Sequence, residues 1–176
     1  MQMKLFIFCL WFSAHSCIFA SEPKQPLFIV DGDSVNINVV LFLDIAQSPM
    51  EELSGKTDLK MRIAGIDTPE IKQTCEIEQG KSIDCGLLAK DYLQKLLENE
   101  PGDLVIKPIG VDYYQRILIR LFKGETDIGK KMVEDGMSYS YDGTYKIEEN
   151  YAKENKLGFW NFFKPPVNPK IWRKEH

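Results

Sequence analysis

Three short segments carry polar side chains that could act together on a phosphate ester. They are "DGDS" at residues 31–34, "RIAGIDTPE" at 62–70 and "YYQR" at 113–116. Taken alone, each has an ordinary structural interpretation, because Asp-Gly pairs favour turns, Asp and Thr bond to nearby backbone N–H groups, and an arginine can open an exposed strand. The segments indicate catalysis only if the fold brings them together.

The acidic residues of these segments suit a hard metal ion. Asp33 and Asp67 both lie where a strand is expected to end, so they could give two carboxylate oxygens to one cation. Ca²⁺ suits such a site, with waters and a backbone carbonyl, such as that of Thr68, completing its coordination. Glu70 follows the rigid Pro69 and would lie near a metal-bound or neighbouring water.

Two arginines offer chemistry that complements the acids. Arg62 and Arg116 carry planar guanidinium groups that can bind phosphate oxygens through paired hydrogen bonds, which a lysine cannot reproduce. The chain has two histidines, His15 and His176, and this shortage disfavours zinc hydrolases, Ser-His-Asp and Cys-His catalysis, and RNA cleavage by paired histidines. Hydrolysis here would depend on carboxylates, arginines and a hard metal.

Strands with inserted and appended helices are expected to position these residues, which describes a small barrel carrying helices. The chain is rich in β-branched and aromatic residues where strands are expected, and its helices show apolar residues at helical spacing. The expected strands lie within 26–43, 59–66, 103–111 and 116–122, and the expected helices within 85–102, 127–136 and 145–158. We expect an exposed loop at 44–58 and, because of its prolines, a tail at 159–176 without regular structure that packs on the domain through its aromatic residues.

The N-terminus has the layout of a secretory signal peptide. Residues 1–20 contain one Lys, an apolar run too short to span a bilayer, and a small residue, Ala20, at the expected cleavage point. Cys17 could instead be read as a lipid-attachment cysteine, although the residues before it fit that pattern poorly. We therefore expect residues 21–176 to form a single secreted or periplasmic domain, monomeric and without stable membrane association.

Removal of that segment leaves two of the four cysteines, Cys75 and Cys85. An even pair in a chain bound for an oxidising compartment predicts a disulfide. The alternative is a share of a metal site, but such a site lacks histidine partners. We interpret the disulfide as a brace for the loop that carries Glu70.

The charge balance shapes any interaction with nucleic acid. The formal net charge is −4, so the global positive field typical of nucleic-acid binders is absent and binding would have to be local. The tail carries Lys164, Lys170, Arg173 and Lys174 against Glu175. These cations could hold substrate, or they could belong to a frayed, solvated terminus.

The three segments, in this order, resemble those of the staphylococcal nuclease (thermonuclease) family of secreted bacterial-type nucleases, and the similarity extends over most of the mature chain. The resemblance implies an α+β, mainly β fold: a five-stranded OB-type barrel with about three helices. It also implies a Ca²⁺-dependent endonuclease that hydrolyses phosphodiester bonds of DNA, RNA or both and leaves 3′-phosphate products.

The resemblance also assigns a role to individual residues. Asp33 and Asp67 match the calcium carboxylates and Thr68 the carbonyl ligand. Glu70 matches the general base or water positioner. The remaining matches are the phosphate-binding Arg62 and Arg116, Asp31 as an acid that helps through water, Tyr114 near the terminal phosphate, and Tyr139 and Tyr141 as residues lining the nucleotide pocket.

The main alternative is a catalytically inactive OB-type module that only binds nucleic acid or another partner. Such modules generally lose the carboxylates and arginines first, whereas all of them are present in this chain. The sequence therefore favours an active nuclease.

Overall fold

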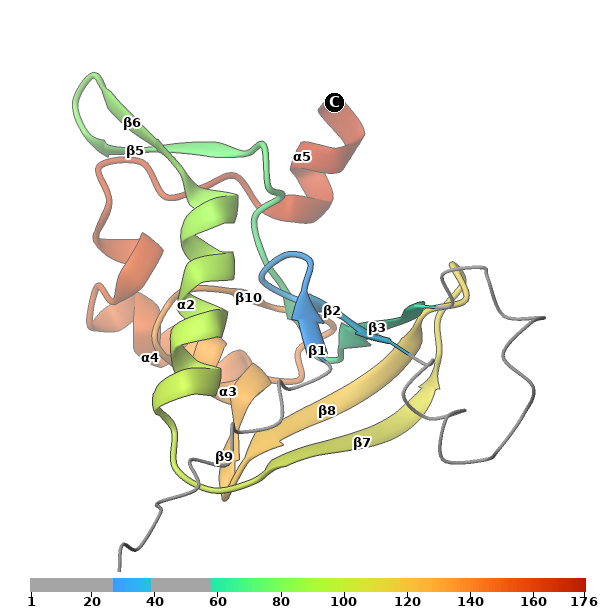
Figure 1. The fold of residues 1–176 in the computed structure, drawn as a ribbon. Helices are drawn as coiled ribbons and strands as arrows, with labels where there is room; N and C mark the ends of the chain where they lie inside the picture. Colours follow the sequence, from blue (N-terminus) through green and yellow to red (C-terminus); the bar gives the residue numbers. More distant parts are fainter. Residues whose placement is uncertain (1–26, 39–57) are drawn as a thin grey trace, which may run out of the picture.

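The computed structural model describes residues 27–38 and 58–176 (Figure 1). The signal-peptide prediction for residues 1–20, and nearly all of the loop expected at 44–58, lie outside the described residues. Among the helices that the structure describes, none has the length and apolar character needed to cross a membrane.

A mixed sheet forms the body of the domain and curls into a half-barrel (Figure 1). Neighbouring strands are antiparallel except β3 and β8, which run parallel. This arrangement confirms the expected five-stranded OB-type fold and adds one short strand. Across the sheet the order is β1 (Leu27–Ile29), β2 (Ser34–Asn38), β3 (Asp58–Ile63), β8 (Ile117–Lys123) and β7 (Leu104–Val111), with β9 (Thr126–Asp127) paired to β8.

The core lies between the concave side of this sheet and the helices. Val35, Ile63, Ile119 and Leu121 point inward from the central strands and are almost completely buried. Alternation along β8 leaves Arg120 between two of them in solvent, as expected for a strand with one buried face. The sheet is therefore rigid where the ends of β2 and β3 present the candidate site.

The three expected helices are confirmed as α2 (Cys85–Asn99), α3 (Ile128–Glu134) and α4 (Lys146–Glu154). Helix α2 buries a stripe of Ala89, Leu93, Leu96 and Leu97 at the spacing of one helix face, and it ends just before Pro101. In Figure 1 it stands beside β1, with α3 near its C-terminal end.

The expectation of an irregular tail was wrong, because it contains η2 (Gly158–Asn161) and a fourth helix, α5 (Pro169–Glu175). Pro169 starts α5 at a position where a helix does not need the missing N–H, and the Asn168 side chain caps that end by accepting from the Lys170 N–H at 3.0 Å. The expected packing of tail aromatics is confirmed by Phe159, which is 1% exposed.

A hairpin of β5 (Thr74–Glu78) and β6 (Lys81–Asp84) leads into α2 and carries the predicted disulfide. Cys75 and Cys85 are bonded, with Cα atoms 5.8 Å apart. This confirms the pairing and leaves neither sulfur for a metal site. Two further short strands, β4 (Ile66–Asp67) and β10 (Tyr139–Ser140), pair beside the main sheet.

Candidate active site

The candidate site forms where the turn between β1 and β2 meets the end of β4. Asp31 and Asp33 lie in this turn, and the backbone N–H of Asp33 donates to Asp31 Oδ1 at 3.0 Å. Gly32 allows the turn to approach Thr68 closely, since a Cβ at this position would lie 2.8 Å from the Thr68 methyl. The Thr68 N–H in turn donates to Asp33 Oδ2 at 3.0 Å, which fixes the carboxylate against β4.

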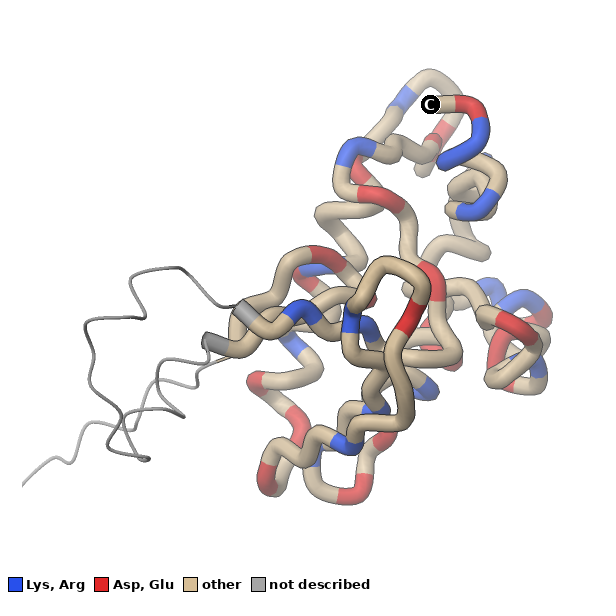
Figure 2. The backbone as a smooth tube through the Cα atoms, turned by 90° about the vertical axis from the view of Figure 1, so that its right-hand side faces the viewer, with Lys and Arg blue, Asp and Glu red and all other residues tan. Residues whose placement is uncertain are grey.

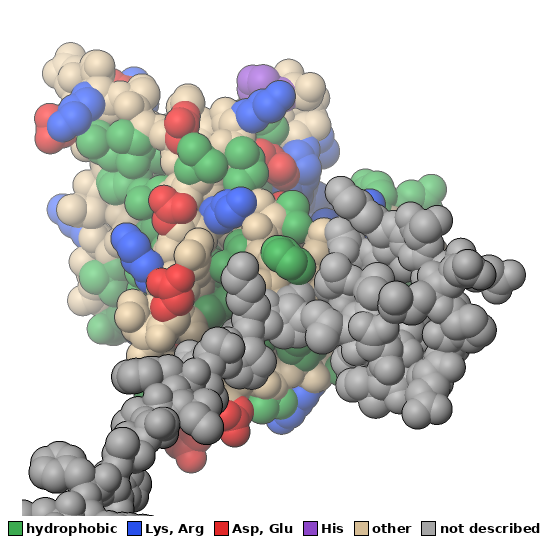
Figure 3. All heavy atoms as spheres, viewed as in Figure 1, with side chains coloured by type: hydrophobic (Ala, Val, Ile, Leu, Met, Phe, Trp, Pro, Cys, Tyr) green, Lys and Arg blue, Asp and Glu red, His purple; other side chains and the backbone are tan. Residues whose placement is uncertain are grey.

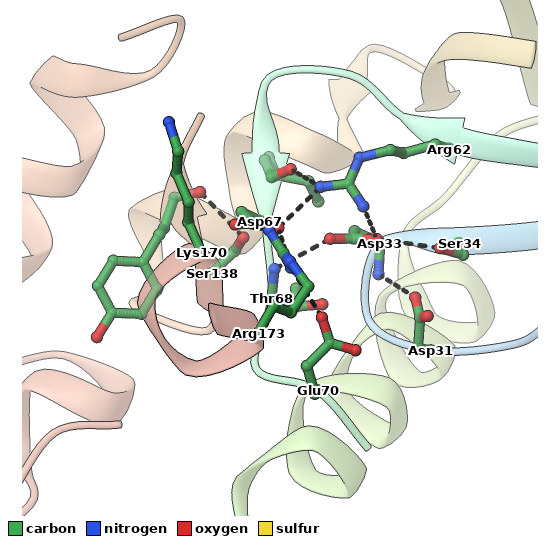
Figure 4. A network of polar contacts seen from close by, with 12 residues as sticks. Asp31, Asp33, Ser34, Arg62, Asp67, Thr68, Glu70, Ser138, Lys170 and Arg173 are labelled. Carbon is green, nitrogen blue, oxygen red and sulfur yellow. Dashed lines mark hydrogen bonds and ion pairs between the residues drawn. The ribbon is translucent and has the colours of Figure 1, made fainter. Parts of the chain in front are cut away.

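Arg62 joins the two carboxylates that the sequence analysis selected. It extends from β3, which pairs with β2 in a register that places Arg62 opposite Ser34. Its Nη1 lies 2.7 Å from Asp33 Oδ1 and its Nη2 lies 2.8 Å from Asp67 Oδ1. The guanidinium therefore stands between both acids, as Figure 4 shows.

Burial dominates the electrostatics of this cluster. Asp33 is only 3% exposed, and burial raises the pKa of Asp33 to about 7; Asp31 and Asp67 add to the rise, whereas Arg62 and the Thr68 N–H oppose it. Burial also opposes the charge of Arg62, but Asp33 and Asp67 hold the pKa of Arg62 above its ordinary value. Arg62, which Asp33 shares with Asp67, thus compensates the charge of Asp33 incompletely.

Glu70 lies at the edge of the cluster and is held by a residue of the tail. Arg173 of α5 donates from Nη1 to Glu70 Oε1 at 2.7 Å, and from Nη2 to Asp67 Oδ2 at 2.9 Å (Figure 4). These bonds raise the pKa of Arg173, with the bond to Asp67 as the largest cause. A segment about a hundred residues away in sequence therefore completes the polar network.

Gln73 fixes the loop that carries Glu70, and sequence reasoning missed it. Gln73 is 1% exposed; its Oε1 accepts from the Glu70 N–H at 3.2 Å, while its Nε2 donates to the Val167 carbonyl at 2.6 Å. The first turn of α2 closes on the same loop, because a Cβ at Gly86 would lie 1.9 Å from the Glu70 carbonyl oxygen. A buried glutamine inside a polar segment gave no signal in the sequence.

A half-open groove of about 800 Å³ runs beside the cluster. Arg116 borders it, just before β8, and pairs with Asp112 through Nη2 at 2.7 Å. Backbone and side-chain hydrogen bonds from Arg116 lower the pKa of Asp112 despite its desolvation. The residues that line the groove are Lys60, Arg62, Glu70, Asp112, Tyr113, Tyr114, Arg116, Leu118, Tyr141, Asp142, Lys170 and Arg173.

Two of the three tyrosines named from the sequence border this groove. Tyr114 is 75% exposed, with Arg116 5.6 Å from the centre of its ring. Tyr141 lies 5.9 Å from the Arg62 guanidinium carbon. Tyr139 is not a groove residue, because it is buried, donates its hydroxyl to the Pro166 carbonyl and packs edge-on against Trp160.

The structure thus brings most of the predicted residues to one place. Asp31, Asp33, Arg62, Asp67, Thr68 and Glu70 form the contacting cluster, and Arg116, Tyr114 and Tyr141 lie along the groove. Sequence reasoning missed Lys60 and Asp112. Alternation along β3 could have indicated Lys60, which lies two residues before Arg62 on the same face.

The donor set fits a hard cation that takes part of its coordination from water. Asp33 and Asp67 offer carboxylate oxygens on either side of Arg62, and carboxylates with waters are ligands that Ca²⁺ accepts. Within residues 27–38 and 58–176, no three His, Cys, Asp or Glu side chains form a ready metal cluster. A cation bound by these two carboxylates would therefore need backbone or water ligands as well. Because Asp33 is buried, a cation beside it would stabilise its charged form.

Basic residues outnumber acidic ones in the lining of the groove, although the protein is acidic: Lys60, Arg62, Arg116, Lys170 and Arg173 stand against Glu70, Asp112 and Asp142. Figure 2 shows Lys and Arg positions on α5 near the C-terminus and along the strands. The face seen in Figure 3 instead mixes hydrophobic, acidic and basic side chains. Positive charge is therefore local, as the sequence analysis required for binding of a polyanion.

Comparisons with known proteins agree with this geometry. A family model described as "Staphylococcal nuclease homologue" matches residues 60–162, which include Arg62, Asp67, Glu70 and Arg116. The chain is similar to "Probable endonuclease LCL3" of Komagataella phaffii, with 30% identity over 125 residues, 62% of this chain and 51% of the relative. It is also similar to "Probable endonuclease lcl3" of Sclerotinia sclerotiorum, with 29% identity over 126 residues, 63% of this chain and 45% of the relative.

The chain spans about half the length of these curated relatives. The family model covers more than half of the chain and contains Arg62, Asp67, Glu70 and Arg116, whereas Asp31 and Asp33 precede the matched residues. The chain therefore belongs to the staphylococcal nuclease family.

Proposed function

We propose that this protein is a Ca²⁺-dependent nuclease that hydrolyses phosphodiester bonds of DNA, RNA or both and leaves 3′-phosphate ends. The observation that carries the proposal is the position of Arg62 between two buried carboxylates, at 2.7 and 2.8 Å, beside a groove that Arg116 also borders. Family membership and the relatives named as probable endonucleases give it further support.

The residues of the site would have separate chemical roles. Held by Asp33, Asp67 and the Thr68 carbonyl, Ca²⁺ would supply positive charge next to the phosphate. Glu70 would accept a proton from the attacking water as the 5′ oxygen leaves.

The arginines would bind the equatorial phosphate oxygens, on which charge grows in the transition state. Both arginines line the groove, and the side chain of Arg62 is 13% exposed while that of Arg116 is 26% exposed. Removing one such donor typically costs on the order of 100-fold to 1000-fold in turnover. These groups recognise the phosphate and not the sugar, which supports action on both DNA and RNA.

The test is cleavage of end-labelled single-stranded DNA and RNA, with Ca²⁺ or with EDTA, by the wild type, Glu70→Ala and Arg116→Ala. We expect Ca²⁺-dependent cleavage that falls about 100-fold or more in both variants. Arg120→Ala is the matched control, because Arg120 lies on β8 outside the groove and is 45% exposed. Fragments that accept 3′ extension only after phosphatase treatment would identify 3′-phosphate ends.

Other results would contradict the proposal. Binding of DNA without cleavage would favour the inactive nucleic-acid-binding module. Full activity in Arg116→Ala would remove that arginine from the mechanism.

We also propose that the protein is exported to the periplasm or the medium and acts there as a monomer. The disulfide between Cys75 and Cys85 supports export, because disulfides persist in oxidising compartments. Mass spectrometry of the exported protein should find an N-terminus after Ala20, and light scattering should give a single-chain mass. An intact N-terminus on protein retained in the cytoplasm would contradict export.

A further inference from the structure

Arg173 pairs with two carboxylates on which the proposed function depends. Asp67 is the proposed cation ligand and Glu70 is the proposed base. Its Nη2 lies 2.9 Å from Asp67 Oδ2, and its Nη1 lies 3.1 Å from Asp67 Oδ1 and 2.7 Å from Glu70 Oε1. Since Arg62 also donates to Asp67 Oδ1, both oxygens of Asp67 are engaged by guanidinium groups. A cation could reach Asp67 Oδ2 only after Arg173 moves.

The helix that carries Arg173 is otherwise weakly attached. Among the described residues, Arg173 makes all the ion pairs and hydrogen bonds that join α5 to residues outside the tail. Trp172 stacks on His176 of the same terminal segment, and Ile171 is 51% exposed. A helix of seven residues has little stability alone, so release of α5 would disturb little else.

The chain just before α5 is firmly held, which would let the helix move as a flap. The Val167 carbonyl accepts from Gln73, and the Pro166 carbonyl accepts from Tyr139. Further upstream, the Lys164 N–H donates to the Glu76 carbonyl at 2.9 Å. The anchored segment thus extends to Pro169, which is buried at the first position of α5, and the polar attachment beyond it is the pairing of Arg173.

The charge of the cluster explains why Arg173 and Ca²⁺ would compete for the same carboxylates. Asp33, Asp67 and Glu70 pair with Arg62 and Arg173, so three carboxylates share two guanidinium groups. Asp31, which accepts from the Asp33 N–H, adds a fourth negative charge beside them. Without Arg173 the acids would carry a larger uncompensated charge and would bind a divalent cation more tightly.

We propose that α5 is an autoinhibitory flap whose Arg173 occupies the cation site and is displaced when Ca²⁺ binds Asp67. This inference rests on the cation site of the proposed function. It predicts that the resting protein binds Ca²⁺ more weakly than the same carboxylates would without Arg173. It also predicts that Ca²⁺ binding releases α5 toward solvent.

The test is Ca²⁺ affinity by titration calorimetry on the complete protein. Arg173→Ala should bind Ca²⁺ about tenfold or more tightly than the wild type, equivalent to about 1.4 kcal/mol. Arg173→Lys, which keeps the charge but loses the paired bonds, should lie between them. Lys174→Ala is the matched control, because it removes the same charge from an exposed neighbour with no ion pair among the described residues.

Hydrogen exchange gives an independent measure of release. On addition of Ca²⁺, the amides of Ile171 and Trp172, which donate to Asn168, should exchange faster in the wild type, and Asp67→Asn should abolish this response. Equal Ca²⁺ affinity in the wild type and Arg173→Ala would overturn the flap and leave the nuclease proposal intact. Absence of Ca²⁺ binding in both would overturn the cation site itself, and the flap with it.

Discussion

Asp33 in the candidate site and Glu149 on α4 are both nearly buried, at 3% and 4% exposure, yet their pKa values shift in opposite directions. Burial raises the pKa of Asp33 to about 7, with Asp31 and Asp67 adding to the effect. Burial also acts on Glu149, but hydrogen bonds from Lys146 and Lys153 outweigh it and lower the pKa.

The difference lies in where the compensating charge comes from. Glu149 has two lysines on its own helix, three residues before it and four residues after it. Asp33 shares Arg62 with Asp67 and has Asp31 nearby. A fully compensated carboxylate stabilises the fold, whereas an incompletely compensated one is ready to receive a further cation.

The largest expected effect comes from removing the arginine that both buried acids share. Arg62→Ala leaves Asp33 and Asp67 without their common partner, and breaking a buried pair in this way typically costs about 3 to 5 kcal/mol. Urea denaturation in EDTA should show this loss in the free energy of unfolding. Arg120→Ala, which removes a partly exposed partner of Asp127 at 3.7 Å, should cost less than about 1 kcal/mol; similar losses in both variants would contradict the comparison.

The disulfide should stabilise the loop that carries Glu70, beside the candidate site. The loop between Cys75 and Cys85 spans 10 residues, so replacing both by Ala should cost about 2 to 3 kcal/mol. The hairpin adjoins Gln73, whose carbonyl accepts from the Cys85 N–H at 2.9 Å, and nuclease activity should fall with stability. Unchanged melting temperature and activity would rule out a bracing role for the Glu70 loop.

Neutralising Glu149 should produce a smaller loss that depends on pH. With its folded pKa below the ordinary value of 4.5, Glu149 stabilises the protein above that pH, and its contribution disappears as pH falls through the folded pKa. Glu149→Gln should therefore lose about 2 kcal/mol at pH 7 and progressively less as the pH falls below 4.5. Urea denaturation at pH 7 and below pH 4.5 measures this, and an equal loss under both conditions would show that charge is not the cause.

Asp33 should give a pH slope of opposite sign to that of Glu149. Because its folded pKa is raised from 3.8 to about 7, Asp33 favours the folded state below pH 3.8 and this contribution is lost as pH rises through about 7. One proton changes stability by at most about 1.4 kcal/mol per pH unit. In EDTA, the difference in unfolding free energy between wild type and Asp33→Asn should decrease from pH 4 to pH 7, and a rising difference would contradict the assignment.

Local patterns in the sequence accounted for much of the fold. The apolar spacing along α2 predicted a helix that ends before Pro101, and the β-branched and aromatic residues of 116–122 predicted β8. The α5 helix was missed because three prolines in the tail indicated irregular structure, whereas the structure uses Pro169 at the first position of the helix. Proline excludes a helix only where its N–H is needed.

The sequence likewise predicted part of the candidate site correctly and part of it wrongly. Residue types and order selected Asp33, Arg62, Asp67 and Glu70, because few other chemistries suit carboxylates and arginines in a chain so poor in histidine. The resemblance assigned Tyr139 to the pocket together with Tyr141, but β10 ends at Ser140, before Tyr141, and Tyr139 is buried against Trp160.

The sequence by itself determined the five main strands of the sheet and three helices, the disulfide pair, and which acids and arginines could act on a phosphate. These follow from periodicity and side-chain chemistry, whereas the β5–β6 hairpin and the short strands β9 and β10 were not predicted. Only the tertiary structure decided which charges meet. Arg62 lies 29 residues from Asp33, and Arg173 lies 106 residues from Asp67. Contacts over such separations depend on how the sheet curls and where the tail is anchored. No local sequence pattern therefore predicts that Arg173 pairs with Asp67 and Glu70.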